Sequence, residues 1–228
     1  MQAGGKLRFD RRWLTLVLAT FVFEVALFAV VSNVPLSPSD ANSLLNDTRA
    51  ILSQIENEPL MFNALDIFAN NALIAVFEFV PFLGWIRFVE VTILTGQVIS
   101  ALASSSGVPA SILLITTFLS PHSWVELMAY AVAIAESILM VYSAFAKRLK
   151  EELSRAAASF ALVILMLMVA ALLEAITVQY SIEGFVYAWA VALAIGLAVS
   201  WAYLRMRRSG TASIGGAAPQ TEAPLSDT

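Results

Sequence analysis

Seven acidic residues are the side chains whose type and position could do chemistry, because they fall within long apolar stretches of the sequence. An ionised carboxylate inside a bilayer costs about 2.5–3.5 kcal/mol on insertion scales, so each one must be paired, protonated or sheltered. Such carboxylates mark ion or proton routes, or they tie helices together by hydrogen bonds. The seven are Glu24, Asp66, Glu78, Glu90, Glu126, Glu136 and Glu174.

Most of these acids share a helical stripe with amide or small side chains, at about 100° per residue. The stripes carry Asn63, Asp66, Asn70, Asn71 and Glu78 in the second apolar stretch, Glu90, Gln97, Ala101 and Ser104 in the third, and His122, Glu126, Ala129, Ala133 and Glu136 in the fourth. Small residues such as Gly96, Ser100 and Ser104 would let helices approach closely. The predicted intramembrane polar cluster is Asn70, Asn71, His122, Glu126, Asp66, Glu78, Glu90, Gln97 and Glu136.

The elements that position these residues follow from composition. Of 228 residues, 59% are hydrophobic and only 13% are charged, whereas a typical soluble domain has about 25% charged residues. The apolar residues form runs that approach the roughly 20 residues a helix needs to cross a bilayer. These features exclude a soluble enzyme, a nucleic-acid-binding module and a disordered protein. They predict an all-α, polytopic membrane helical bundle.

Residues 1–208 are expected to form a single transmembrane domain with six spans, and residues 209–228 a disordered cytoplasmic tail rich in small and polar residues. The expected spans are 13–32, 61–82, 86–104, 123–146, 157–178 and 185–204. An external amphipathic helix is predicted over 38–57, with Ser37 as its cap and Pro38 at its first position. The apolar segment 109–120 is too short to cross and is predicted to be re-entrant or interfacial.

Lysine and arginine set the orientation, because cytoplasmic loops carry an excess of them. With six spans and both termini inside, 12 of the 13 basic residues lie on the cytoplasmic side and only Arg49 lies outside. We therefore predict a multi-pass cell-membrane protein with cytoplasmic N- and C-termini.

No complete catalytic or metal-binding set is visible in the sequence. There is no cysteine and only one histidine. His122 and Glu126 are spaced to face one ligand, but a zinc site normally needs three protein ligands. A serine near His122 lacks the Gly-x-Ser-x-Gly turn of a hydrolase nucleophile. We expect no enzymatic activity, no catalytic or metal-binding residue and no cofactor.

Several short motifs resemble the stage II sporulation protein M family. They are Phe68-Ala-Asn70-Asn71-Ala72, then Ile93-Leu94-Thr95-Gly96-Gln97 leading to Gly107, and Ser120-Pro121-His122-Ser123-Trp124-Val125-Glu126-Leu127. Asn70, Asn71, Gly96, Gly107, His122 and Glu126 match the marks of that family. Thr95 stands where the family tends to have Asn, and Ser123 where it tends to have Gly. In spore-forming bacteria the resemblance implies a non-catalytic membrane partner of cell-wall hydrolases.

Two functions stay open at this point. The first is a membrane scaffold that binds other membrane or envelope proteins within the lipid bilayer, and the small-residue faces also allow a homo-oligomer. The alternative is an ion, proton or small-solute channel or transporter that uses the intramembrane acidic seam. Nucleic acid is not an expected partner.

Overall fold

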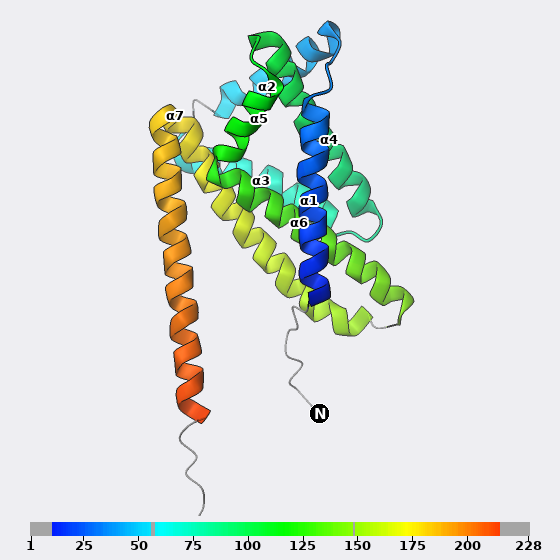
Figure 1. The fold of residues 1–228 in the computed structure, drawn as a ribbon, viewed down its shortest axis with the longest axis vertical. Coiled ribbons are helices and arrows are strands. Elements are labelled where there is room, and N and C mark those ends of the chain that lie inside the picture. Colours follow the sequence, from blue (N-terminus) through cyan, green and yellow to red (C-terminus); the bar gives the residue numbers. More distant parts are fainter. Residues whose placement is uncertain (1–10, 56–57, 148, 215–228) are drawn as a thin grey trace, which may run out of the picture. The chain divides into compact units, whose positions relative to one another are not determined.

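All regular structure in the described residues is helical. The computed structural model describes residues 11–55, 58–147 and 149–214 (Figure 1). The helices, in chain order, are α1 (Arg11–Ser32), α2 (Pro38–Ile55), α3 (Leu60–Glu78), α4 (Leu83–Ser106), α5 (Ala110–Leu119), α6 (Pro121–Phe145) and α7 (Leu149–Ile214). Within this part of the chain, six segments are long and apolar enough to cross a membrane: α1, α3, α4, α6, and Glu152–Tyr180 and Ile182–Ala202 of α7. The predicted fold class, a polytopic helical bundle, is confirmed.

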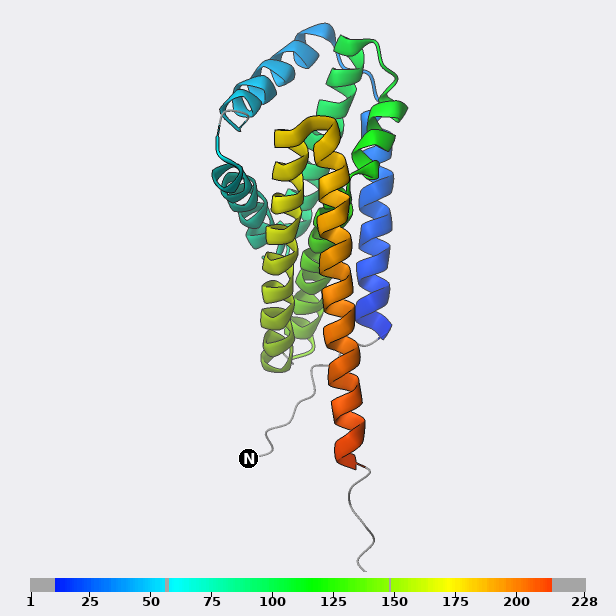
Figure 2. The same cartoon turned by 90° about the vertical axis from the view of Figure 1, so that its left-hand side faces the viewer.

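The chain divides into two compact units, Met1–Trp189 and Ala190–Thr228. Within the first unit, α7 reverses direction near Tyr180 (Figures 1 and 2). The two arms meet closely at Gly184, where a Cβ atom would lie 2.4 Å from the carbonyl oxygen of Ile176. Only a residue without a side chain fits this turn.

The second unit continues α7 to Ile214, beyond the predicted start of the tail at 209. Within this unit the guanidinium of Arg205 lies 5.2 Å from the centre of the Trp201 ring, which is a cation–π distance. The rest of the predicted tail, residues 215–228, lies outside the described residues.

Helix α6 is the centre of the first unit. Every residue from Ala129 to Ala135 is at most 4% exposed, and a helix that is apolar and buried all round is a core helix. It packs with Val17 of α1, Phe88 of α4 and Leu167 of α7 in one hydrophobic core.

Helices α1 and α4 approach each other closely at small residues, as the sequence predicted for Gly96 and Ser100. A Cβ atom on Gly96 would lie 2.9 Å from Val31 of α1. One turn further on, the Ser100 hydroxyl donates a 2.6 Å hydrogen bond to the carbonyl oxygen of Val34. The small residues therefore bring two backbones together and provide a donor for a carbonyl just beyond the end of α1.

The second span ends earlier than predicted. Helix α3 stops at Glu78 instead of 82 because Pro81 disfavours helical backbone at the preceding residue, Val80. Gly84, the second residue of α4, lies so close to the end of α3 that a Cβ atom would lie 2.0 Å from the carbonyl oxygen of Glu78. This tight turn holds the Glu78 side chain at the junction of α3 and α4.

Helices α2 and α5 lie at the same end of the first unit as the reversal of α7 (Figure 2). The predicted start of α2 is confirmed: the Ser37 hydroxyl accepts a hydrogen bond from the Asp40 backbone N–H at 3.2 Å and donates to the Asp40 carboxylate at 2.6 Å. Helix α2 ends at Ile55, and residues 56–57 of its predicted range lie outside the described residues.

Helix α5 has 10 residues, about 15 Å of helix, which is half of what a bilayer core requires. Its last carbonyl groups lack partners within the helix, and three side chains from later helices supply them. Ser123 donates to Thr117, Trp124 to Phe118 and Trp189 to Leu119, at 2.6–3.0 Å. These contacts fix α5 against the start of α6.

Candidate functional site: an acidic cavity within the bundle

The first unit contains a cavity of about 640 Å³, open on one side, to which all seven helices contribute side chains. Its volume falls in the range of small-molecule sites. Its lining residues are Glu24, Phe28, Thr48, Glu58, Asp66, Ile67, Asn70, Asn71, Ile74, Glu78, Val91, Thr92, Thr95, Thr117, His122, Ser123, Glu126, Leu127, Tyr130 and Glu174.

Helix α3 supplies the longest polar wall, on the arc that the sequence predicted. Asp66, Asn70, Asn71 and Glu78 all line the cavity. Asn71 and Glu78 are buried, whereas Asp66 and Asn70 are exposed. The exposed pair therefore marks the side on which the cavity opens, and Glu78 marks its closed end.

Two carboxyl groups at the closed end have oxygens without hydrogen-bond partners. Glu24 of α1 is 2% exposed and Glu78 is 1% exposed, and within the described residues neither Oε2 atom has a partner. The two carboxyl groups lie close enough to interact electrostatically with each other and with Glu126. A buried oxygen that gains no hydrogen bond is costly, so this end of the cavity is suited to receive a donor.

Helix α6 brings the histidine motif to the same cavity. The Tyr130 hydroxyl donates a 2.9 Å hydrogen bond to Glu126, four residues earlier on the same face. At the start of the helix the His122 ring nitrogen Nδ1 lies 2.7 Å from the Ser120 hydroxyl. Glu174 of α7 also lines the cavity and lies near enough to Glu126 to interact electrostatically with it.

Three threonine hydroxyls of the wall donate their hydrogen bonds within their own helices. Thr92, Thr95 and Thr117 each donate to a backbone carbonyl one turn earlier in their own helix, at 2.8–3.0 Å. A hydroxyl that donates elsewhere presents only lone pairs to its surroundings. The wall therefore accepts hydrogen bonds more readily than it donates them.

Three residues of the predicted cluster lie outside this cavity. Glu90 of α4 is exposed and forms a 2.9 Å ion pair with Arg87. The inward face of α4 carries Thr92, Gly96 and Ser100. The predicted stripe through Glu90 and Gln97 meets another helix only at its far end, where Ala101 packs on α2. Helical periodicity identified a polar stripe, but the smaller side chains decided which face packs.

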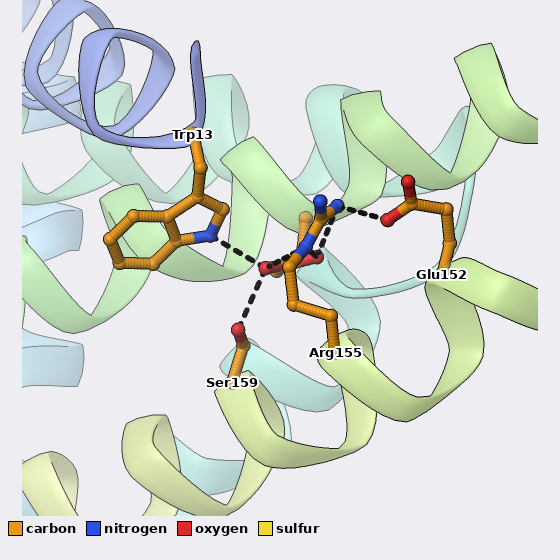
Figure 3. Close-up of polar contacts among 5 residues, drawn as sticks. Trp13, Glu152, Arg155 and Ser159 are labelled. Carbon is orange, nitrogen blue, oxygen red and sulfur yellow. Dashed lines mark hydrogen bonds and ion pairs between the residues drawn. The ribbon is translucent and has the colours of Figure 1, made fainter. Parts of the chain in front are cut away.

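Glu136 shares a helix face with Glu126 but lies 10 residues further along α6, about 15 Å away. There it forms a separate polar centre (Figure 3). Its carboxylate is 0% exposed and accepts hydrogen bonds from Trp13 at 2.6 Å, from Ser159 at 2.7 Å and from Arg155 at 3.3 Å. Arg155 also pairs with Glu152 at 2.5 Å. This centre ties α1, α6 and α7 together and leaves no open position for a ligand.

The sequence cluster missed several lining residues. Glu24 and Glu174 were recognised as acids within spans, but a lone acid on an apolar helix gives no second polar residue to define a face. Tyr130 follows Glu126 at a spacing of four, which is a usable signal. The threonines gave no signal in the sequence, because threonine is common on both lipid-facing and buried helix faces.

The cavity is a place for binding, with carboxylates, amides and hydroxyls around a polar space. Among the described residues, no group of three or more histidine and acidic side chains is placed to hold a metal ion. Together the six apolar spans and the acid-lined cavity define a class: a multi-pass helical membrane protein with an acidic cavity within its helical bundle.

The comparisons with known proteins give the family. Residues 15–178 match Stage II sporulation protein M, SpoIIM, so the match extends from α1 through the first arm of α7 and includes the cavity. The chain belongs to the Stage II sporulation protein M family, as its motifs predicted. The comparison with curated proteins gave no match, and neither did the comparison with solved structures.

Proposed function

We propose that the chain is a non-catalytic membrane scaffold that binds other membrane or envelope proteins through the polar face of α2. The observation that carries the proposal is the way α2 is held. Ala41 and Leu45 of α2 are at most 5% exposed and pack on Ala101 of α4. The apolar side of this amphipathic helix is therefore covered by the chain itself over the first turns, where the side chains are described.

The opposite side of α2 is a fixed polar surface. Its exposed side chains are Ser39, Asp40, Asn42, Ser43, Asn46, Asp47 and Arg49. On the predicted topology this surface lies outside the cytoplasm, where an envelope protein can reach it. A helix that is held in place presents its side chains without the ordering cost that a flexible loop would incur.

Photo-crosslinking in intact membranes tests this proposal. A photoreactive residue at Asn46 or Asp47 should give a discrete protein adduct, and the same residue at Leu73, an exposed apolar position of α3, should not. The adduct should disappear when Asn42→Arg is introduced beside it. Equal adducts at all three positions, or none at Asn46 and Asp47, would contradict the scaffold.

A second candidate function, a route for an ion, proton or small solute, is favoured by the acidic cavity. Six carboxyl side chains around one polar space within a bundle are the usual mark of such a route. Purified protein in liposomes that carries a solute or proton flux, with the flux lost in Glu78→Gln, would support it. Absence of flux in wild-type liposomes would contradict it.

A further inference from the structure

We propose that the acidic cavity is a binding site for a small organic cation that carries an ammonium group on an alkyl chain. The inference rests on the cavity that favours the second candidate function, but binding requires no transport. Four features of the cavity carry it: charge, hydrogen-bonding capacity, unpartnered buried oxygens and size.

The charge of the lining is one-sided. Six acidic side chains line the cavity, and among the described residues no lysine or arginine does. The six are Glu24, Glu58, Asp66, Glu78, Glu126 and Glu174. Clustered carboxylates favour a cation over a neutral or anionic guest.

The hydrogen-bonding capacity of the wall is complementary to a donor. The hydroxyls of Thr92, Thr95 and Thr117 donate to their own helices, and that of Tyr130 donates to Glu126. The Asn70 amide donates to Asn71 at 3.2 Å. What remains toward the cavity is mainly oxygen lone pairs, and an ammonium has three donors and no acceptor.

The buried end of the cavity has unpartnered acceptors that line it. The Oε2 atoms of Glu24 and Glu78 have no hydrogen-bond partner within the described chain, and both side chains are at least 98% buried. A single ammonium placed between α1 and α3 at this end would donate charge-assisted hydrogen bonds to these oxygens, and such bonds are about twice as strong as neutral ones.

Size and lining separate an organic cation from a metal ion. A space of about 640 Å³ holds a small molecule, whereas no group of three histidine or acidic side chains among the described residues is placed to hold a metal. Between the acids the wall is apolar, formed by Phe28, Ile67, Ile74, Val91 and Leu127. An alkyl chain would be removed from water against these side chains.

Calorimetric titration of the full-length protein in detergent tests the site. The probe is 1,4-diaminobutane, with the neutral 1,4-butanediol and Mg²⁺ as comparators. We expect saturable binding of the diamine and at least tenfold weaker binding of both comparators. Glu24→Gln and Glu78→Gln keep the shape of the side chain and remove its charge, so each should weaken diamine binding about tenfold or more. The control Glu90→Gln, outside the cavity, should bind within twofold of wild type.

The outcomes separate clearly. No saturable diamine binding, diol or Mg²⁺ binding as tight as the diamine, or an equal loss in Glu90→Gln and Glu78→Gln would overturn the proposal. If the buried variants do not fold, the exposed cavity residue Asp66→Asn takes their place, with the same expected loss. Diamine binding without any flux in liposomes would support the site and contradict transport, so the two proposals fail separately.

Discussion

The buried carboxylate of Glu136 predicts a large cost for losing its counter-charge. Glu136 is 0% exposed, and Arg155, its ion-pair partner, is 13% exposed. Removing one partner of a buried pair leaves an uncompensated charge and costs about 3–5 kcal/mol. Trp13 and Ser159 still donate to the carboxylate, so we expect Arg155→Met to lower the free energy of unfolding by about 3 kcal/mol, near the lower end of that range.

A matched control lies in α4. The Arg87–Glu90 pair has side chains 37% and 53% exposed, and exposed pairs contribute about 0–1 kcal/mol. Arg87→Met should therefore change the free energy of unfolding by less than about 1 kcal/mol. Both variants can be measured by unfolding in mixed micelles with a denaturing detergent, followed by tryptophan fluorescence.

A rescue distinguishes lost charge from lost packing. In Arg155→Met combined with Glu136→Gln, the amide oxygen keeps the hydrogen bonds from Trp13 and Ser159 but carries no charge. The double variant should be more stable than Arg155→Met alone. The reasoning is refuted if Arg155→Met costs no more than Arg87→Met, or if adding Glu136→Gln recovers nothing.

Three further predictions concern the fold. Gly84→Ala would place a Cβ 2.0 Å from the carbonyl oxygen of Glu78, so we expect little or no folded protein on size-exclusion chromatography of detergent extracts. Ser100→Ala removes the 2.6 Å hydrogen bond to the Val34 carbonyl and should cost about 0.5–1.5 kcal/mol; an unfolding free energy equal to wild type would contradict this. A reporter fused after Arg208 should be active only in the cytoplasm, and an exported reporter would contradict the topology.

The fold could be predicted largely from the sequence because membrane spans are dictated by length and apolarity. Each of the six expected spans corresponds to a helix or an arm of α7, and the short segment at 109–120 became the short helix α5. The predicted end of the second span at residue 82 was wrong, since α3 ends at Glu78. The apolar run of the sequence continues through Val80 and Pro81, although the backbone turns there. The sequence around Tyr180 contains no proline that would predict the reversal of α7, and Gly184 is the one residue nearby that indicates it.

The candidate site could be predicted only in part, because periodicity gives the face of one helix but not its depth or its neighbours. Asp66, Asn70, Asn71 and Glu78 share a face that indeed lines the cavity. Glu136 shares a face with Glu126 but lies too far along α6 to join it. Whether a polar stripe packs inward depends on the helix opposite, and α4 turns its small residues inward instead of Glu90.

Water should enter the acid-lined cavity within the span of α3, and cysteine accessibility measures this directly. The chain has no cysteine, so a thiol reagent can label only the single cysteine that is introduced. Asn71 and Leu73 lie two residues apart on opposite faces of α3; Asn71 lines the cavity and Leu73 is an exposed apolar residue. In native membranes Asn71→Cys should react with a hydrophilic thiol reagent and Leu73→Cys should not. Equal reactivity at the two positions, or reaction at Leu73→Cys alone, would contradict the account.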